Sequence, residues 1–179
     1  NPKLELKGEW SGSQISAGYI DLSFENDGPK HLIDLLARPN ITSKEWLIRQ
    51  YDHEVQGMSV IKPLHTASAG TKSAVSGPND GGVVKVKSDS WLGVSVGCGI
   101  NPKLSDIDPY LMAQSAVDEA VRNVLCVGGE YGKRESVIAL IDNFCWPDPV
   151  GDAQKTAALV RACYGMREAC LRLGIPLIP

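Results

Sequence analysis

Apolar positions recur with two different periods along this 179-residue chain, and each period predicts a different element. A period of two, typical of strands, runs through 84–87 and 92–97, where valines and a leucine alternate with lysine, glycine and serine. A period near 3.6, typical of amphipathic helices, marks two longer stretches. The first has apolar positions at Ala113, Val117, Ala120, Val121 and Val124. The second has them at Leu159, Cys163, Met166, Cys170 and Leu173.

Local signals set the ends of these two helices. Asp108 precedes Pro109, which is the arrangement of an N-cap carboxylate followed by a proline in the first helical position. Gly128 and Gly129 follow the apolar stripe and are expected to end the first helix. The second helix is expected from about Asp152 to Leu173, with the glycine after it as its stop.

The rest of the chain predicts shorter elements. We expect helices at about 31–37 and from residue 42 or 43 to about 51, and a central strand over the apolar run 136–141. The segment 64–82 is rich in glycine and small polar residues, so a flexible linker is favoured over a phosphate-binding loop. This order of elements predicts an α+β fold, with a mixed or antiparallel sheet that carries helices on one face.

The charge and composition of the chain argue against a nucleic-acid-binding protein and against a membrane-spanning protein. The net charge of −3 and the pI near 5.6 give no basic footprint for nucleic acid, and no apolar run is long enough to cross a bilayer. Five cysteines, an odd number without a C-x-x-C pair, are interpreted as buried thiols of a reducing compartment. We therefore expect a cytoplasmic protein.

Several short segments follow one another in the order of a known family pattern. They are 49–57, 60–63, 81–86, 101–103, 108–110, 116–123 and 142–146, which read RQYDHEVQG, VIKP, GGVVKV, NPK, DPY, AVDEAVRN and DNFCW. Over about residues 30–179 they resemble the second aminoimidazole-ribonucleotide-synthetase-like (AIR-synthase-like) N-terminal domain of the formylglycinamide ribonucleotide amidotransferases, also called phosphoribosylformylglycinamidine synthases. The chain lacks an initiator Met. The resemblance implies that 29–179 is a domain of a longer chain and that 1–28 is an extension or a set of irregular strands.

The resemblance implies a pairing mode and a reaction. Two such domains pair through their sheets into a barrel, which in the full enzyme joins two halves of one polypeptide. An isolated half has an uncovered apolar sheet surface, so we expect a homodimer. The implied reaction uses ATP and Mg²⁺, with ammonia delivered from glutamine by a glutaminase subunit or domain. The expected partners are thus the missing half and the glutaminase.

The candidate cofactor-binding residues are Asp142, Asn143 and Lys62. By resemblance the position of Asp142 contacts nucleotide, while the alternative is that Asp142 and Asn143 satisfy a turn after a strand. Lys62 is a plausible phosphate ligand, and the alternative is a solvated Lys62 beside an Arg49–Asp52 ion pair. The family continuation D-N-L-N-F-G-N-P is altered here, because the chain reads Asp142-Asn143-Phe144-Cys145-Trp146-Pro147-Asp148.

No metal-ligand set or catalytic residue is assigned. Related domains carry a Thr-Asp pair where this chain reads Gly97-Cys98-Gly99-Ile100-Asn101, so an acidic metal ligand is missing. Asp80 is interpreted as part of a tight turn. His31, His53 and His65 show no metal-ligand spacing and are expected to be structural or on the surface.

Two functions from different classes remain open at this stage. The chain is either an inactive piece of an ATP-dependent ligase that supplies part of a nucleotide site, or an assembly module whose nucleotide pocket is vestigial. A related thiamine-phosphate or selenide kinase is disfavoured by the motif at 49–57 and by the context of Asp142.

Overall fold

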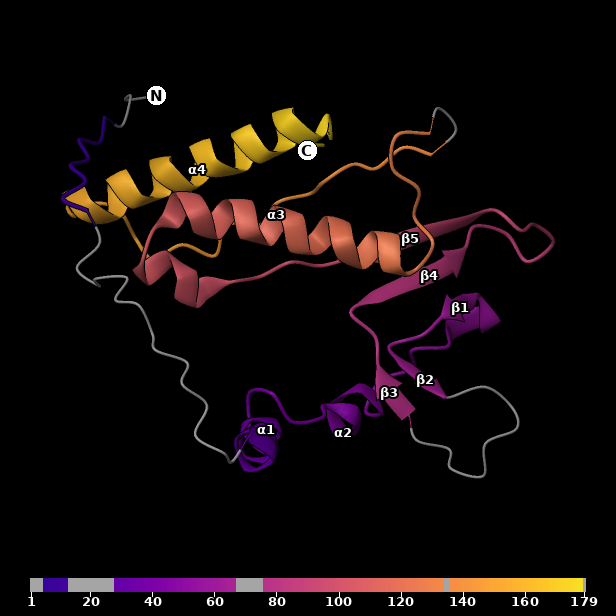
Figure 1. The fold of residues 1–179 in the computed structure, drawn as a ribbon. Helices are drawn as coiled ribbons and strands as arrows, with labels where there is room; N and C mark the ends of the chain where they lie inside the picture. Colours follow the sequence, from indigo (N-terminus) through magenta and orange to yellow (C-terminus); the bar gives the residue numbers. More distant parts are fainter. Residues whose placement is uncertain (1–4, 13–27, 67–75, 134–135, 179) are drawn as a thin grey trace. The chain divides into compact units, whose positions relative to one another are not determined.

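The computed structural model describes residues 5–12, 28–66, 76–133 and 136–178, and Figure 1 shows the order of its helices and strands. The chain divides into two compact units, one of residues 18–94 and one of residues 1–17 with 95–179. The expected division at residues 28 and 29 stays a prediction. Each unit is described separately below.

The unit of residues 18–94 contains short helices and small antiparallel ladders. Its elements are α1 (Gly28–Leu36), α2 (Glu45–Ile48), a 3-10 turn (Val55–Gly57), β1 (Ser59–Ile61), β2 (Leu64–Thr66), β3 (Ser76–Pro78) and β4 (Gly81–Lys85). β2 pairs with β3, and β1 pairs with β4, both in antiparallel fashion. β5 (Gly93–Gly97) continues from this unit into the other and completes a sheet of order β1-β4-β5. The α+β class is confirmed.

The prediction of a flexible linker over 64–82 is wrong at both ends of this segment. Leu64–Thr66 and Ser76–Pro78 form the β2–β3 ladder, and residues 67–75 lie outside the described part of the chain. The ladder forms because backbone groups that lie close in space pair with one another whatever the side chains, and small polar side chains do not prevent this pairing. Asp80 lies in the bend between β3 and β4, as expected for a turn residue.

The apolar face of the β4–β5 hairpin is exposed. We call the set Val84, Val86, Leu92 and Val94 the hairpin face. The N–H of Val86 donates to the carbonyl of Leu92 at 3.1 Å, which places these two residues opposite one another on the hairpin. The four side chains are between 45% and 73% exposed. The hairpin face is therefore an exposed apolar surface, and the expectation that it pairs with a like domain stays a prediction.

The other unit is built on two long helices that pack side by side, α3 (Pro109–Cys126) and α4 (Ala153–Leu173), as Figure 1 shows. A 3-10 helix (Pro102–Asp106) precedes α3. The predicted N-cap at Asp108 and the predicted stop at Gly174 are confirmed, and Asp152 is a further N-cap. Asp108 Oδ1 accepts from the N–H of Tyr110 at 2.9 Å, Asp152 Oδ1 accepts from the N–H of Lys155 at 3.0 Å, and Gly174 adopts the left-handed conformation after α4.

The buried face of α3 matches the sequence pattern, but that of α4 is rotated from it. α3 buries Ala113, Val117, Ala120 and Val121. α4 buries mostly small residues, namely Thr156, Ala162, Gly165, Ala169 and Cys170. A Cβ built on Gly165 would lie 2.2 Å from the carbonyl oxygen of Tyr110, so backbone meets backbone there. The larger Met166 and Leu173 flank this line and pack on the core formed by Val117, Ala169 and Cys170.

The prediction of a central strand at 136–141 is wrong. Only Leu140 forms a bridge, parallel to Leu177, and its N–H donates to the carbonyl of Pro176 at 2.9 Å. Val137 and Ile141 are 83% and 76% exposed. A central strand needs neighbours on both edges, and in the described part of the chain this segment meets one bridge partner.

The prediction of buried cysteines is also wrong for four of the five. Cys98, Cys126, Cys145 and Cys163 are exposed, and Cys170 is buried. Cys126 and Cys163 lie on helices, which present only one face to the core, and Cys98 and Cys145 lie outside helices and strands. Among the described residues, no helix is long and apolar enough to cross a membrane.

Candidate functional site

The segment from Asp142 to Asp152 joins the Leu140 bridge to the start of α4. Asp142 is exposed, and among the described residues its side chain forms no hydrogen bond or ion pair. Cys163 is exposed as a residue, but its thiol is partly desolvated, and this desolvation followed by the charge of Asp142 raises its pKa; the same two causes raise the pKa of the buried Cys170. The negative charge of Asp142 therefore acts on both thiols of α4.

Asn143 is engaged within its own loop. Its carbonyl accepts from the N–H of Cys145 at 3.2 Å, and its side-chain oxygen accepts from the Cys145 thiol at 3.8 Å. Phe144 and Trp146 lie with their ring centroids 6.2 Å apart, and the Trp146 indole donates to the carbonyl of Lys155 at 3.3 Å. Cys145 stands where an Asn is common in the family, and its thiol is a hydrogen-bond partner of the Asn143 side chain.

Lys62 belongs to the other unit, where its ammonium group pairs with the carboxylate of Glu54. The hydrogen bond from Lys62 is the main reason why the pKa of Glu54 is lowered. The carbonyl of Lys62 accepts from the side-chain amide of Asn79 at 2.8 Å. Asp142 and Asn143 therefore share one loop, and Lys62 has a carboxylate partner elsewhere.

The alternative interpretation of this region is wrong in its Arg49–Asp52 pair, whereas its solvated Lys62 agrees with a side chain that is 38% exposed. Arg49 pairs instead with Glu45, one helical turn earlier, at 2.6 Å. Asp52 Oδ1 accepts from the N–H of Glu54 at 2.8 Å. Glu45 lies one turn before Arg49 on the same side of the chain's helical segment, and the N–H of Glu54 engages Asp52 within its own turn, so each group has a partner other than the predicted one. His53, in the same motif, has a buried Nδ1 without a hydrogen-bond partner among the described residues.

A second polar cluster, which the sequence reasoning missed, joins the segment 97–101 to α3. Glu119 Oε2 accepts from the N–H of Ile100 at 3.1 Å and from the Asn101 amide at 3.3 Å. The amide of Asn123 donates to the carbonyl of Cys98 at 2.8 Å. The spacing of four between Glu119 and Asn123 places both on one helix face, and this is the signal in the sequence that could have found them.

Glycine is required where this segment meets α3. A Cβ on Gly99 would lie 1.9 Å from the carbonyl oxygen of Ala116, and a Cβ on Gly97 would lie 2.9 Å from that of Ala120. The run 97–101 that lacks the family's acidic residue thus presses its backbone onto the helix. Within the described ranges, no group of three or more His, Cys, Asp or Glu side chains could hold a metal ion. The expectation that this half binds no metal alone stays a prediction.

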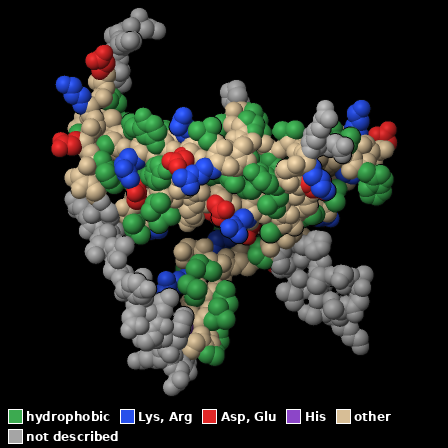
Figure 2. All heavy atoms as spheres, turned by 45° about the horizontal axis from the view of Figure 1, so that its top comes forward, with side chains coloured by type: hydrophobic (Ala, Val, Ile, Leu, Met, Phe, Trp, Pro, Cys, Tyr) green, Lys and Arg blue, Asp and Glu red, His purple; other side chains and the backbone are tan. Residues whose placement is uncertain are grey.

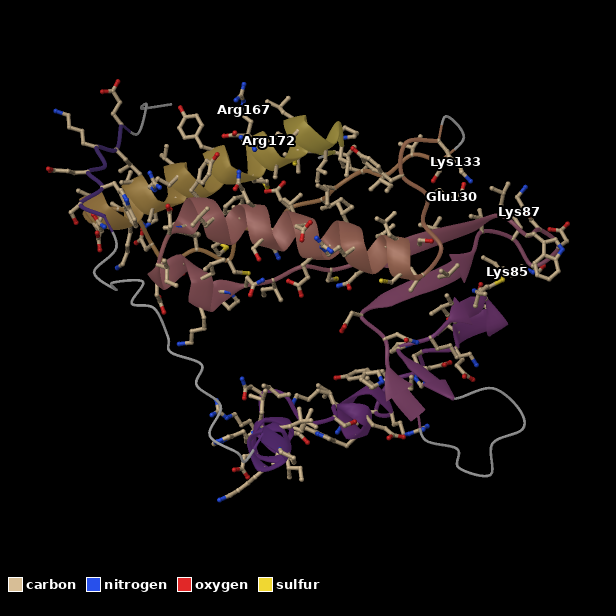
Figure 3. The ribbon with its side chains drawn as sticks, in the orientation of Figure 1. Lys85, Lys87, Glu130, Lys133, Arg167 and Arg172 are labelled. Atoms are coloured by element: carbon tan, nitrogen blue, oxygen red, sulfur yellow. The ribbon has the colours of Figure 1, made fainter. Side chains whose placement is uncertain are left out.

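Charged side chains over the helical unit are mostly paired with close neighbours in the sequence. Figure 3 shows Arg167 and Arg172 on α4, with Lys133 and Glu130 on the segment after α3. Arg172 pairs with Glu168, and Lys133 pairs with Glu130 at 2.6 Å. In Figure 2 the charges of both signs are interspersed with apolar side chains on the face shown. The described cations on this face form no single-sign patch of the kind that attracts a polyanion.

Comparison with known proteins gives a family. Residues 78–179, more than half of the chain, match the family model described as AIR synthase related protein, N-terminal domain. The chain is 38% identical over 149 residues to phosphoribosylformylglycinamidine synthase subunit PurL of Anaeromyxobacter sp. (strain K). The aligned region covers 82% of this chain and 17% of the relative. The PurL subunit of Nostoc sp. (strain PCC 7120) is 35% identical over 188 residues, or 96% of this chain and 22% of the relative.

The same subunit of Streptomyces coelicolor is 33% identical over 148 residues, which are 82% of this chain and 17% of the relative. The chain spans about a fifth of the length of the curated relatives it matches. No solved structure matches significantly.

Proposed function

The chain belongs to the family of AIR synthase related proteins, N-terminal domain, and from this membership we propose that it is one domain of a phosphoribosylformylglycinamidine synthase of purine biosynthesis. Identity of 33–38% with PurL subunits over most of this chain supports the proposal. Since the chain spans about a fifth of those relatives, the domain is proposed to supply part of a site and to have no activity by itself.

In the proposed reaction, ATP phosphorylates the amide oxygen of formylglycinamide ribonucleotide. This step releases ADP. Ammonia then attacks the carbon of the activated amide and displaces phosphate, which gives the amidine. Such chemistry needs cations to hold polyphosphate and oxygen ligands to hold Mg²⁺. Among the described residues, no group of three or more His, Cys, Asp or Glu side chains could hold a metal ion, so no catalytic step is assigned to them.

The observation that carries the proposal is the match of residues 78–179 to the family model, and within this domain Asp142 is the candidate ligand. Its carboxylate is exposed and makes no hydrogen bond within the described residues, whereas Asp108 and Asp152 both cap helices. A carboxylate that only satisfied a turn would accept backbone N–H groups, as Asp148 does from Val150 at 2.9 Å. Asp142 is therefore the group of this loop that remains available to a ligand.

The hairpin face supports the proposed pairing. Its four side chains form an uncovered apolar surface on adjacent strands, and burial of apolar surface favours association. We propose that it is covered by a like domain, either the missing half of the polypeptide or a second copy. A glutaminase partner and cytoplasmic location belong to the same proposal through the family alone.

A second candidate function is an assembly module with a vestigial nucleotide pocket. Two observations favour it, because Lys62 is paired with Glu54 and the side chain of Asn143 is occupied by Cys145. Each candidate ligand other than Asp142 thus has an internal partner. With this function, the hairpin face would still pair with a like domain, and the loop of Asp142 would bind no nucleotide.

Calorimetric titration of Mg-ADP and Mg-ATP into the chain separates the two candidates. The matched variants are Asp142→Asn, which removes the proposed contact, and Asp118→Asn, which removes an exposed carboxylate that pairs with Arg122 on α3. Heat that is lost in Asp142→Asn and kept in Asp118→Asn supports a nucleotide site. No heat with the unaltered chain, or equal heat with all three proteins, contradicts a site at Asp142 and leaves the assembly module as the function.

A further inference from the structure

The first turn of α4 is held from two sides, and one side is the segment of residues 5–12, called here the strap. The N–H of Glu9 donates to the carbonyl of Ala153 at 3.0 Å. The N–H and the hydroxyl of Ser11 both donate to Oε1 of Gln154, at 3.2 and 3.4 Å. The strap therefore follows the start of α4 through several consecutive contacts.

The contact between the strap and α4 is close and requires glycine at one position. A Cβ on Gly8 would lie 2.7 Å from the backbone nitrogen of Ala157 and 2.9 Å from its Cα. Real Cβ atoms do not approach backbone so closely, because repulsion rises steeply below van der Waals contact. Any larger residue at position 8 would separate the strap from the helix.

Trp10 joins the strap to the ion pair of Asp108 and Arg161. The guanidinium of Arg161 lies 5.1 Å from the centre of the Trp10 ring, within range of a cation–π contact. Arg161 is itself fixed, since its Nε and Nη2 donate to the two carboxylate oxygens of Asp108 at 3.1 and 2.7 Å. Trp10 is half-buried on a cation whose position is set by α3 and α4 together.

The other side of the same turn holds the loop that carries Asp142. The Trp146 indole donates to the carbonyl of Lys155. The hydroxyl of the buried Thr156 donates to the carbonyl of Pro149 at 2.9 Å, and the N–H of Asp152 donates to that same carbonyl at 3.2 Å. The loop is thus attached to residues 152–156, beside the helix positions that the strap contacts.

We propose that the strap is a positioning element for the loop 142–152, and that Trp10 is its anchor. The first turn of α4 has few helical hydrogen bonds of its own, as every helix start does, so external contacts decide whether it stays ordered. When the strap is docked, residues 153–157 are fixed and the loop contacts that depend on them are kept. The consequence for ligand binding at Asp142 rests on the proposed function, whereas the coupling between strap and loop does not.

Hydrogen–deuterium exchange of the chain without nucleotide tests this coupling. The perturbing variant is Trp10→Ala, and Trp10→Phe keeps an aromatic ring for Arg161. The matched control is Trp91→Ala, because Trp91 is almost fully exposed on the β4–β5 hairpin and belongs to the other unit. Loop amides 142–152 are expected to exchange about two- to thirtyfold faster in Trp10→Ala, the factor that a cation–π contact supplies. The exchange rates of α3 amides in Trp10→Ala should stay near those of the unaltered chain. The loop exchange rates in Trp10→Phe and Trp91→Ala should also stay near those of the unaltered chain.

A milder variant keeps the test valid if Trp10→Ala loses structure. Gln154→Ala removes the acceptor of Ser11 from an exposed contact and is expected to speed loop exchange by a smaller factor. Unchanged loop exchange in both variants would refute the coupling. Equal acceleration in α3 and in the loop would also refute it, since that pattern reports general loss of stability. Neither result bears on nucleotide heat, so failure of this inference and failure of the nucleotide site are distinguishable.

Discussion

The ion pair of Asp108 and Arg161 joins the start of α3 to the middle of α4, and its removal should destabilise the helical unit by a predictable amount. Asp108→Ala removes an N-cap, worth about 1 kcal/mol, and two charge-assisted hydrogen bonds, worth about 1–2 kcal/mol together. The second figure is taken at the low end because the side chains are 23% and 35% exposed. We expect a total loss of about 2–3 kcal/mol in free energy of unfolding.

Asp108→Asn separates the two contributions. Asparagine is as good an N-cap as aspartate, so this variant keeps the cap and loses the charge, and it should cost about 1 kcal/mol. A double-mutant cycle of Asp108→Asn with Arg161→Met is expected to give a coupling free energy of about 1 kcal/mol. Urea unfolding followed by circular dichroism at the helix band measures each value. Additive single losses, with no coupling, would show that the pair does not link the two helices.

The pair also predicts a pH dependence. Burial alone would raise the pKa of Asp108, but the hydrogen bonds from Arg161 and from the Tyr110 N–H outweigh it, so the pKa lies below its ordinary value of 3.8. A carboxyl with a lowered folded-state pKa contributes its full stability above the unfolded pKa and loses it as the pH falls through the folded pKa. The stability difference between the unaltered chain and Asp108→Asn should therefore be constant near neutral pH and shrink below about pH 4. A difference that grows toward acid pH would contradict this assignment.

Further predictions concern the helix contact, the α4 cap and the thiol beside Asp142. Gly165→Ala should destabilise the unit by about 1–2 kcal/mol in urea unfolding, because overpacking against Tyr110 outweighs the gain in helix propensity, and a stabilised variant would refute the close helix contact. Asp152→Ala should cost about 1 kcal/mol through its lost cap while Asp152→Asn costs little, and equal losses would contradict a capping role. Asp142→Asn should speed iodoacetamide alkylation of Cys163 near pH 8, since removal of the carboxylate charge lowers the thiol pKa; an unchanged rate beside an unchanged Cys98 control would place Asp142 away from α4.

The ends of the long helices were predictable because capping is local. The side chain of Asp108 caps an N–H two residues later, and Gly174 supplies a backbone conformation that other residues adopt at a cost. The face that α4 buries was not predictable from its apolar stripe. Backbones approach most closely at small residues such as Gly165, and only the partner helix shows which small residues are used.

Strand periodicity located the β4–β5 hairpin without showing what covers it. Val84 and Val94 alternate as in a half-buried strand, yet in this chain their face is exposed. The run 136–141 has the composition of a central strand but meets a single bridge at Leu140. Pairing depends on neighbours from distant parts of a chain or from another chain, and a local pattern does not contain that information.

The site was predicted in part. Asp142 was expected at the end of a buried strand, but the segment before it forms a single bridge at Leu140 and Ile141 is exposed. The ligand role of Asp142 and Asn143 stays a prediction. The pairing of Lys62 with Glu54 could not be inferred, since eight residues and a turn separate them. Glu119 was missed because it was read as part of a family motif and not as a helix face opposite the segment 97–101.

The central claim is that this chain is a domain whose apolar hairpin face is covered by a like domain. Light scattering of the chain at roughly tens of micromolar tests it most directly, in the affinity range where apolar association of two small domains is detectable. The account predicts a dimer that Val94→Asp converts to a monomer, while Val150→Asp, at an exposed valine of the other unit, leaves it unchanged. A monomer for the unaltered chain, or a dimer that survives Val94→Asp, would contradict the account.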